Sequence, residues 1–396
     1  MTMFVFIVTT LFIVVGLFLF IEFRVHLHNL NSIPIRIHVN GTRGKSSVTR
    51  LIAGALRESN IRVYAKTTGT LPRMIMENGI EYPVYRPAGA NIIEQLRIVS
   101  LAAHHRAEAL VIECMAVHPY LQSITELKFI NATHGVITNA REDHLDVMGP
   151  TEKDVALALL GTVPRKGKMF TAEQDYMDEF IYACKDRKSE LITVDQCDID
   201  SISDKDMSGF SYVEHKENVA LIIKVCESLG VPREVAFRGM WKTPQDPGAL
   251  SEHEIHFFGR KILFINGFAA NDPESSEKIW RLALEEHQEF DRKIMVLSAR
   301  ADRPDRSKQL VEALVNWPQA DRYILMGSGV YVLFRTAVAN GVDPSSFVYA
   351  EGLATSQIFE EIVAISGRSS LVIGIGNIVG PGLELVNYFR NRALQE

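Results

Sequence analysis

Cysteine is scarce in this sequence and basic residues are not in excess, and each shortage argues against a class of protein. The four cysteines, Cys114, Cys184, Cys197 and Cys226, lie far apart and form no CxxC pair, so neither a zinc knuckle nor a dithiol redox motif is indicated. We expect reduced, mostly buried thiols. Lysine and arginine total 42 against 48 aspartates and glutamates, a net charge of −6. This balance argues against a chain built to coat nucleic acid, and no nucleic-acid partner is expected.

The composition excludes a disordered or low-complexity chain, because 47% of the residues are hydrophobic and 23% are charged. The sequence does contain an uncharged N-terminal segment, the 19 residues Met3–Ile21. As a helix they would span about 28 Å, close to the thickness of a bilayer core. We predict a single membrane-spanning anchor over residues 1–22, with a cleaved signal peptide or a buried helix as alternatives. Arg24 and Arg36 follow this segment, which favours a cell-membrane protein whose catalytic body lies in the cytoplasm.

From about residue 34 onward, strand-like and helix-like segments alternate, which predicts an α/β fold with mostly parallel sheets. The segment Val231–Leu250 is rich in proline and has no clear period, so it is interpreted as a linker. We therefore expect an ATP-binding domain over residues 23–245 and a smaller, Rossmann-like domain over residues 246–396. The expected strands are 35–39, 109–114, 135–138, 168–171, 191–194, 261–265, 294–298, 323–326 and 371–375, and the expected helices are 46–58, 92–104, 153–160, 176–184, 216–229, 274–286, 308–315, 330–339 and 355–365.

The clearest motif is a glycine-containing loop between an expected strand and an expected helix. It consists of Asn40, Gly41, Thr42, Arg43, Gly44, Lys45, Ser46 and Ser47. Such a loop binds nucleotide phosphates through backbone N–H groups and the helix N-terminus. Lys45 would reach the β- and γ-phosphates, and Ser46 would bind Mg²⁺. Val39 stands where the general pattern has its first glycine, and a tight turn with an accidental lysine is the alternative.

Three further polar residues lie next to expected strands or helices. Glu113 ends a buried strand at the same sheet edge as the loop, where a carboxylate can bind ligands or form a structural salt bridge. His144 lies among acidic residues after the next strand and is a candidate metal ligand, or a solvated or structural histidine. Asn218 lies near the start of a long expected helix. Its side chain is a candidate ligand contact, and the alternative is a local hydrogen bond to the backbone.

Together these motifs resemble those of the Mur ligase superfamily, which includes the peptidoglycan amino-acid ligases and folylpolyglutamate synthetase. The resemblance covers roughly residues 35–390, and the family's loop also lacks the first Walker glycine. The membrane segment joined directly to the ATPase motif is similar to the ligase subunits of poly-γ-glutamate synthases, which make capsule-type polymers. Leu159 stands where many relatives have a carbamylated lysine. The residues that carry the resemblance are 40–47, Glu113, Thr138-Asn139, 143–146 and 217–220, with Lys66–Thr70 and Gly374–Ile378 for the narrower match.

The resemblance implies an ATP-dependent ligase that activates a glutamate carboxylate as an acyl phosphate and joins it to the amine of another glutamate. It implies ATP and Mg²⁺, with one ion on Ser46 and Glu113 and a possible second ion on His144. Lys45, Glu113 and His144 are the implied catalytic residues. The residues of the loop 40–47 and Asn218 are implied to bind the nucleotide.

The implied partners are glutamate, the growing poly-γ-glutamate and integral membrane subunits of a synthase complex. Arg73 and Arg86 are candidate contacts for substrate carboxylates, because guanidinium groups bind carboxylates through two hydrogen bonds. The second domain is expected to close over the first and exclude water. One alternative is a membrane-anchored P-loop ATPase that powers export or regulates a partner. The other is a ligase similar to folylpolyglutamate synthetase.

Overall fold

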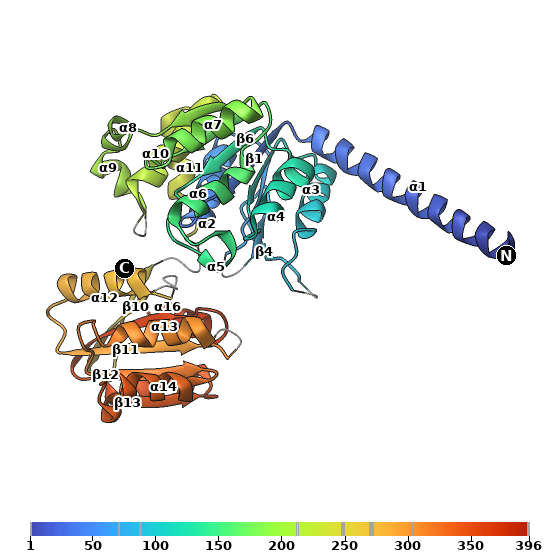
Figure 1. Cartoon of the computed structure of the whole chain (residues 1–396). Helices are drawn as coiled ribbons and strands as arrows, with labels where there is room; N and C mark the ends of the chain where they lie inside the picture. The colour runs from blue at the N-terminus through green and yellow to red at the C-terminus, as the bar shows by residue number, and fades with distance from the viewer. Residues whose placement is uncertain are drawn as a thin grey trace. The chain divides into compact units, whose positions relative to one another are not determined.

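The computed structural model describes residues 2–69, 72–86, 89–210, 212, 214–246, 250–268, 273–301 and 304–393 (Figure 1). The chain divides into two compact units, Met1–Pro244 and Gln245–Glu396. Each unit contains a mostly parallel sheet, so the predicted α/β fold is confirmed.

The sheet of the first unit has eight strands in the order β4-β3-β2-β5-β1-β6-β7-β8. Six of them are parallel, whereas β3 and β4 form an antiparallel pair at one edge. Because β1 lies between β5 and β6, the loop that follows it is at the centre of the carboxyl edge. The strands are β1 (Ile35–Asn40), β2 (Val63–Lys66), β3 (Arg73–Ile75), β4 (Glu81–Pro83), β5 (Ala109–Glu113), β6 (His134–Ile137), β7 (Lys168–Thr171) and β8 (Glu190–Thr193).

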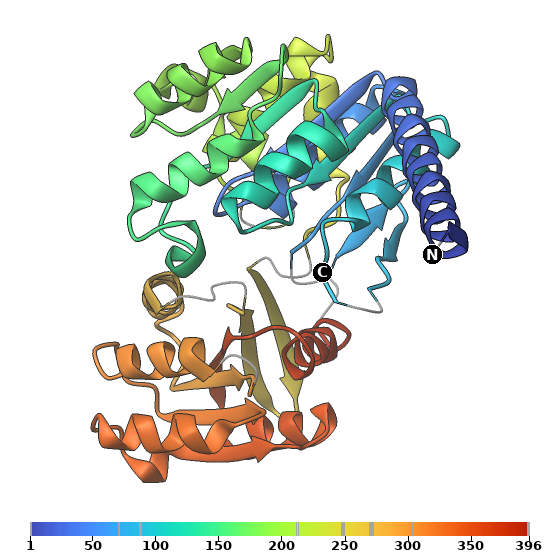
Figure 2. The ribbon, with the colours of Figure 1, turned by 45° about the vertical axis from the view of Figure 1, so that its right-hand side comes forward.

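Helices cover both faces of this sheet (Figure 2). On one face, α2, α10 and α11 build the largest apolar core, and on the other α3, α6 and α7 build two smaller ones. The helices are α1 (Thr2–Ser32), α2 (Lys45–Glu58), α3 (Glu94–His104), α4 (Pro119–Ile124), the π-helix η1 (Thr125–Ile130), α5 (Leu145–Met148), α6 (Glu152–Leu159), the 3₁₀ helix η2 (Leu160–Thr162), α7 (Met177–Arg187), α8 (Gln196–Asp200), α9 (Asp204–Met207), α10 (Lys216–Ser228) and α11 (Arg233–Trp241).

The N-terminal helix α1 is longer than the predicted anchor. Its segment from Met3 onward is long and apolar enough to cross a membrane, by length and composition. The helix continues to Ser32 because its last turns have a protein partner, with Leu30 packed into the core against α3. The Arg36 guanidinium donates to the carbonyl oxygens of Leu30 and Ile33 at 3.0 and 2.5 Å, which ties the end of α1 to β1.

Part of the predicted linker is a helix, which corrects the interpretation of residues 231–250. Arg233–Trp241 forms α11, which packs on α2. Gly239 makes this close packing possible, because a Cβ there would lie 2.7 Å from the Ala55 Cα atom. Gly239 therefore allows the two helices to meet. Residues 247–249 lie outside the described part of the chain.

The sheet of the second unit has six strands in the order β13-β12-β11-β14-β10-β9, and only β9 is antiparallel. One face packs against α12, α13 and α14, and the other against α15 and α16. The sequence patterns did not predict β9, β13 or α16. The elements are β9 (Ser251–Phe257), β10 (Arg260–Asn266), α12 (Pro273–Glu286), β11 (Arg292–Ala299), α13 (Pro304–Leu314), β12 (Arg322–Gly327), α14 (Val330–Ala339), the 3₁₀ helix η3 (Pro344–Ser346), β13 (Phe347–Glu351), α15 (Thr355–Ile365), β14 (Ser369–Gly376) and α16 (Pro381–Arg390).

Candidate active site

The predicted phosphate-binding loop, residues 40–47 and called the phosphate loop below, joins β1 to α2 as the sequence predicts. Its backbone turns at Gly41 (φ 131°) and Gly44 (φ 79°), in a region that favours glycine. A Cβ on Gly41 would collide with the Thr138 hydroxyl, so glycine is required there for space as well. The Lys45 Nζ donates to the carbonyl oxygens of Gly41 (2.6 Å) and Thr42 (3.1 Å). The positive end of the α2 dipole and the Lys45 charge therefore meet at this loop.

Thr138 and Asn139, which follow β6, hold the loop in shape. The Thr42 hydroxyl and the Arg43 backbone N–H both donate to the Asn139 Oδ1, at 2.6 and 3.0 Å. The Thr138 hydroxyl donates to the Arg43 carbonyl oxygen at 2.6 Å. The sequence pointed to Thr138-Asn139 only through the family resemblance, and no local pattern assigned them this bracing role. Their position comes from the pairing of β1 with β6.

Asn40 has a different environment from the rest of the loop. Its side-chain amide donates to the Gln122 Oε1 at 2.7 Å and to the Thr162 hydroxyl at 3.3 Å, and the residue is 3% exposed. The Asn40 side chain therefore ties β1 to α4 and η2. The Asn40 carbonyl oxygen accepts from the Thr138 backbone N–H at 3.0 Å, and contact of Asn40 with a nucleotide stays a prediction.

Ser46 and Glu113 come together at the start of α2. The register that pairs Val39 with Glu113 places this carboxylate beside the loop. The Glu113 Oε2 accepts from the Ser46 hydroxyl at 2.8 Å and from the Thr68 backbone N–H at 2.7 Å. A hydroxyl and a carboxylate oxygen are the ligands that Mg²⁺ prefers, so these residues fit the predicted ion.

Two other residues of the predicted site lie in distinct surroundings. His144 has a left-handed backbone (φ 49°) before α5, its side chain is 38% exposed, and its Nε2 lies 3.9 Å from the Asp143 carboxylate. Its role as a metal ligand stays a prediction. Asn218 lies against the loop, because a Cβ on Gly44 would be 3.2 Å from the Asn218 Nδ2. That same amide donates to the Glu214 carboxylate at 2.9 Å.

The segment after β2 forms a further wall beside Ser46. A Cβ on Gly69 would lie 2.7 Å from the Ser46 hydroxyl, so the two residues are in close contact. Thr70, the last residue of the motif Lys66–Thr70, lies outside the described residues. Leu159, which occupies the position of the carbamylated lysine, is fully buried in an apolar core, so it supplies packing and no charge.

The two arginines proposed for substrate carboxylates differ in their partners. Arg86 donates to both oxygens of Glu94, at 2.5 and 2.9 Å, and the same carboxylate lies 2.6 Å from the buried Lys66 Nζ. Burial lowers the pKa of Lys66, and Glu94 only partly offsets this. Arg86 is therefore held by Glu94, with a side chain that is 19% exposed. Arg73 forms no ion pair within the described residues, and its Nε is buried without a hydrogen-bond partner there.

In the second unit, the motif Gly374–Ile378, which carries the narrower resemblance, lies at the carboxyl end of β14. A Cβ on Gly374 would collide with the Phe268 ring, and Gly376 has a φ of 96°. Ser298, at the end of the neighbouring β11, is 5% exposed, and its hydroxyl has no hydrogen-bond partner among the described residues. Ligands of open α/β sheets bind at such carboxyl edges.

Comparison with known proteins finds a matching protein family for each of the two units. Residues 39–231 match the Mur ligase middle domain, and residues 252–392 match the poly-gamma-glutamate synthase CapB C-terminal domain. A solved bifunctional folylpolyglutamate synthase/dihydrofolate synthase, with Mn, AMPPNP and L-glutamate bound, has a similar fold. Its TM-score is 0.65 at 12% identity, over 93% of this chain and 92% of that one. The chain is thus an ATP-dependent amide ligase of the Mur ligase type.

Two curated relatives narrow this class. The capsule biosynthesis protein CapB of Bacillus anthracis is 38% identical over 92% of this chain and 78% of that protein. The PGA synthase CapB of Bacillus subtilis (strain 168) is 34% identical over 94% of this chain and 95% of that protein. The chain belongs to the CapB family of Mur ligases.

Proposed function

We propose that this chain joins glutamate units into poly-γ-glutamate with ATP as the energy source. The observation that carries the proposal is the Ser46–Glu113 pair at the phosphate loop, inside a Mur ligase fold. The names of the two curated relatives, which refer to capsule biosynthesis and PGA synthesis, support glutamate as the monomer.

The nucleotide would place its phosphates on the loop 40–47, with Asn218 beside Gly44. Ser46 and Glu113 would hold Mg²⁺, and His144 is the proposed holder of a second ion. Bound there, magnesium would neutralise phosphate charge and polarise the γ-phosphate. The folylpolyglutamate synthase neighbour with AMPPNP and Mn bound supports a nucleotide and a divalent ion.

The proposed reaction has two steps. A carboxylate oxygen of glutamate, or of the growing chain, attacks the γ-phosphorus of ATP, and ADP leaves. The amine of the next glutamate, having lost a proton, attacks the carbonyl carbon of the acyl phosphate. The tetrahedral adduct then expels phosphate and leaves an amide. Lys45 would exchange its carbonyl contacts for the phosphates and offset the negative charge on the transferred group.

Arg73 is the proposed contact for a substrate carboxylate. Side chains alternate along a strand, so Arg73 shares a face with Ile75, which packs in the core beside α2. On that face, opposite Ile75, Glu81 binds Arg50 of α2 through both carboxylate oxygens. The Arg73 backbone N–H donates to the Thr67 hydroxyl at 3.3 Å, so Arg73 lies beside the segment that follows β2. We propose that its guanidinium meets a substrate carboxylate there.

The anchor and its partners complete the proposal. Helix α1 would cross the cell membrane once and leave both units in the cytoplasm, and its last turns pack directly on α3. A chain with a net charge of −6 has little attraction for a polyanion. We therefore propose that integral membrane subunits receive the growing polymer.

An isotope experiment tests the chemistry. Membranes that contain the full chain are supplied with ATP, Mg²⁺ and glutamate carrying ¹⁸O in its carboxylates, and the product is analysed for size and linkage. We expect γ-linked polymer and transfer of ¹⁸O to the released phosphate, because the attacking carboxylate oxygen stays with phosphorus. ATP hydrolysis that does not depend on glutamate would favour the alternative, a P-loop ATPase that serves export.

A further inference from the structure

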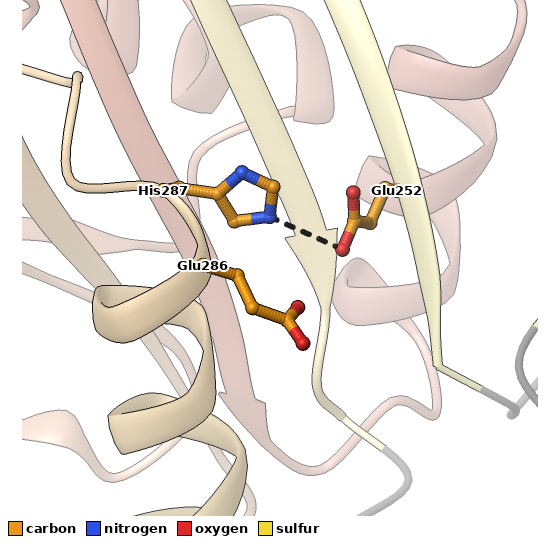
Figure 3. A group of neighbouring side chains, drawn as sticks. All are labelled: Glu252, Glu286 and His287. Atoms are coloured by element: carbon orange, nitrogen blue, oxygen red, sulfur yellow. Dashed lines mark hydrogen bonds and ion pairs between the residues drawn. The ribbon is translucent and has the colours of Figure 1, made fainter.

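The second unit contains three side chains that converge from two different elements. Glu252 is near the start of β9, Glu286 ends α12, and His287 follows it (Figure 3). One potential ligand atom from each residue lies within 4.8 Å of the other two. The His287 Nε2 and the Glu252 Oε1 are 3.3 Å apart. The nucleotide chemistry proposed above uses none of these residues.

We propose that Glu252, Glu286 and His287 form a binding site for a divalent transition-metal ion such as Zn²⁺. One imidazole nitrogen and two carboxylate oxygens are a ligand set that zinc accepts, and the imidazole disfavours Mg²⁺ and Ca²⁺. Two ligand atoms on one tetrahedral zinc ion lie about 3.4 Å apart, close to the His287–Glu252 distance. Three protein ligands leave one position for water.

The local charge also favours a cation. The group lies at the C-terminal end of α12, where the helix dipole is negative and the last turn has no basic residue. Within the described part of the chain, neither Glu252 nor Glu286 forms an ion pair with lysine or arginine. Two carboxylates at the negative end of a helix repel each other, and a bound cation removes that repulsion.

The imidazole is held in place before an ion binds. The His287 side chain is 17% exposed, and its ring meets the Phe290 ring edge-on with 6.1 Å between centroids. Glu252 is positioned by the pairing of β9 with β10, opposite Ile265. An ion at this site would join the start of β9 to the end of α12, so it should stabilise the second unit.

Metal titration of the full chain tests the site. The protein is purified in detergent with a tag that contains no histidine, stripped with a chelator, and titrated calorimetrically with Zn²⁺ and separately with Mg²⁺. We expect a zinc site that His287→Ala and Glu286→Gln each weaken by roughly tenfold or more, because each removes a direct ligand. Zinc should also raise the melting temperature of the wild type and not that of His287→Ala.

Two controls separate this site from other metal sites. His256 pairs with Glu254 at 3.0 Å on the same strand, and no third potential ligand joins this pair among the described residues, so His256→Ala should keep the zinc site. Glu113→Gln should also keep it, which makes the result independent of the proposed catalytic ion. Substitution with Co²⁺ should give a visible d–d spectrum that His287→Ala abolishes. Zinc binding that is absent from the wild type, or unchanged in both His287→Ala and Glu286→Gln, would overturn the proposal.

Discussion

Two carbonyl oxygens hold Lys45 at the phosphate loop, and these contacts indicate no further structural role for its charge. We expect Lys45→Ala to fold normally and to lose on the order of 10²–10³ in glutamate-dependent ATP turnover, because a charge aimed at the transferred phosphoryl group is lost. Steady-state ADP release measures this. The exposed Lys185, replaced by alanine, is the matched control. Near-normal turnover in folded Lys45→Ala would exclude the proposed role.

Ser46 and Glu113 share a hydrogen bond and are proposed to share an ion. Ser46→Ala and Glu113→Gln should each raise the Mg²⁺ concentration needed for half-maximal turnover. If both act through one ion, the double variant should lose less than the sum of the two single losses in activation free energy. Glu108→Gln, a half-exposed carboxylate at the other end of β5, should leave the Mg²⁺ dependence unchanged. Additive losses with an unchanged Mg²⁺ dependence would favour purely structural roles.

Arg73 offers a guanidinium without an ionic partner in the described residues. Arg73→Ala should raise the KM for glutamate with a small effect on the KM for ATP, because only the substrate carboxylate loses a partner. Arg97→Ala, on the exposed side of α3, serves as the control. An equal rise in both KM values would point to a general disturbance of the loop.

At the scale of elements, a buried ion pair joins β1 to the π-helix η1. His38 and Glu126 are both buried, and the His38 Nδ1 lies 2.8 Å from the Glu126 carboxylate. Burial lowers the pKa of His38, but hydrogen bonds to Cys114 and Glu126 outweigh this and raise its pKa from 6.5 to about 9. The protonated imidazole is therefore bound more tightly in the folded chain than in the unfolded one.

This raised pKa sets the pH range of the stabilisation. The contribution should be complete below pH 6.5 and should disappear as the pH rises through about 9. Glu126→Gln removes the charge and keeps the shape of the side chain. The difference in melting temperature between wild type and Glu126→Gln should be large at pH 6 and small at pH values near 10. A difference that is independent of pH would mean that the imidazole does not titrate in this range.

At the scale of the whole molecule, helix α1 contains both the proposed anchor and residues that belong to a core of the first unit. Removal of residues 1–22 keeps Leu30 in its core and removes most of the exposed apolar segment of α1. We expect this truncated chain to be soluble, to bind ATP and to make less polymer in cells, because it is no longer held beside membrane partners. Fractionation, nucleotide binding and polymer yield measure the three outcomes.

A longer truncation provides the comparison. Removal of residues 1–34 also takes away Leu30 and Ile33, which belong to the same apolar core as Val99 and Ala102 of α3. That chain should melt at a lower temperature than the chain without residues 1–22, because the apolar face of α3 becomes exposed. Undiminished polymer from the cytosolic chain that lacks only residues 1–22 would show that the anchor is dispensable.

Much of this architecture was predictable from local patterns. The phosphate loop was recognised because glycines, lysine and serine have a fixed spacing between a strand and a helix, and α14 and α15 were predicted with their observed bounds. Segments with mixed local signals were missed. Helix α11 contains Gly239 beside a proline-rich stretch, and β9 is a mostly half-buried edge strand, so neither shows a clear period.

The sequence by itself determined the α/β class, the apolar character of the N-terminal helix and the position of the glycine-containing loop, because each depends on residues that are close together in the chain. The sequence also predicted Glu113 at the same sheet edge as the loop, but only the tertiary structure decided which contacts the distant residues make with it. Strand register brings Glu113 to Ser46, and the pairing of β1 with β6 sets Asn139 against Thr42. It also turned the Asn40 amide into the protein and tied Arg86 to Glu94, while Arg73 kept no ionic partner among the described residues. Such contacts depend on parallel pairing across many residues, and no local pattern in the sequence encodes that register.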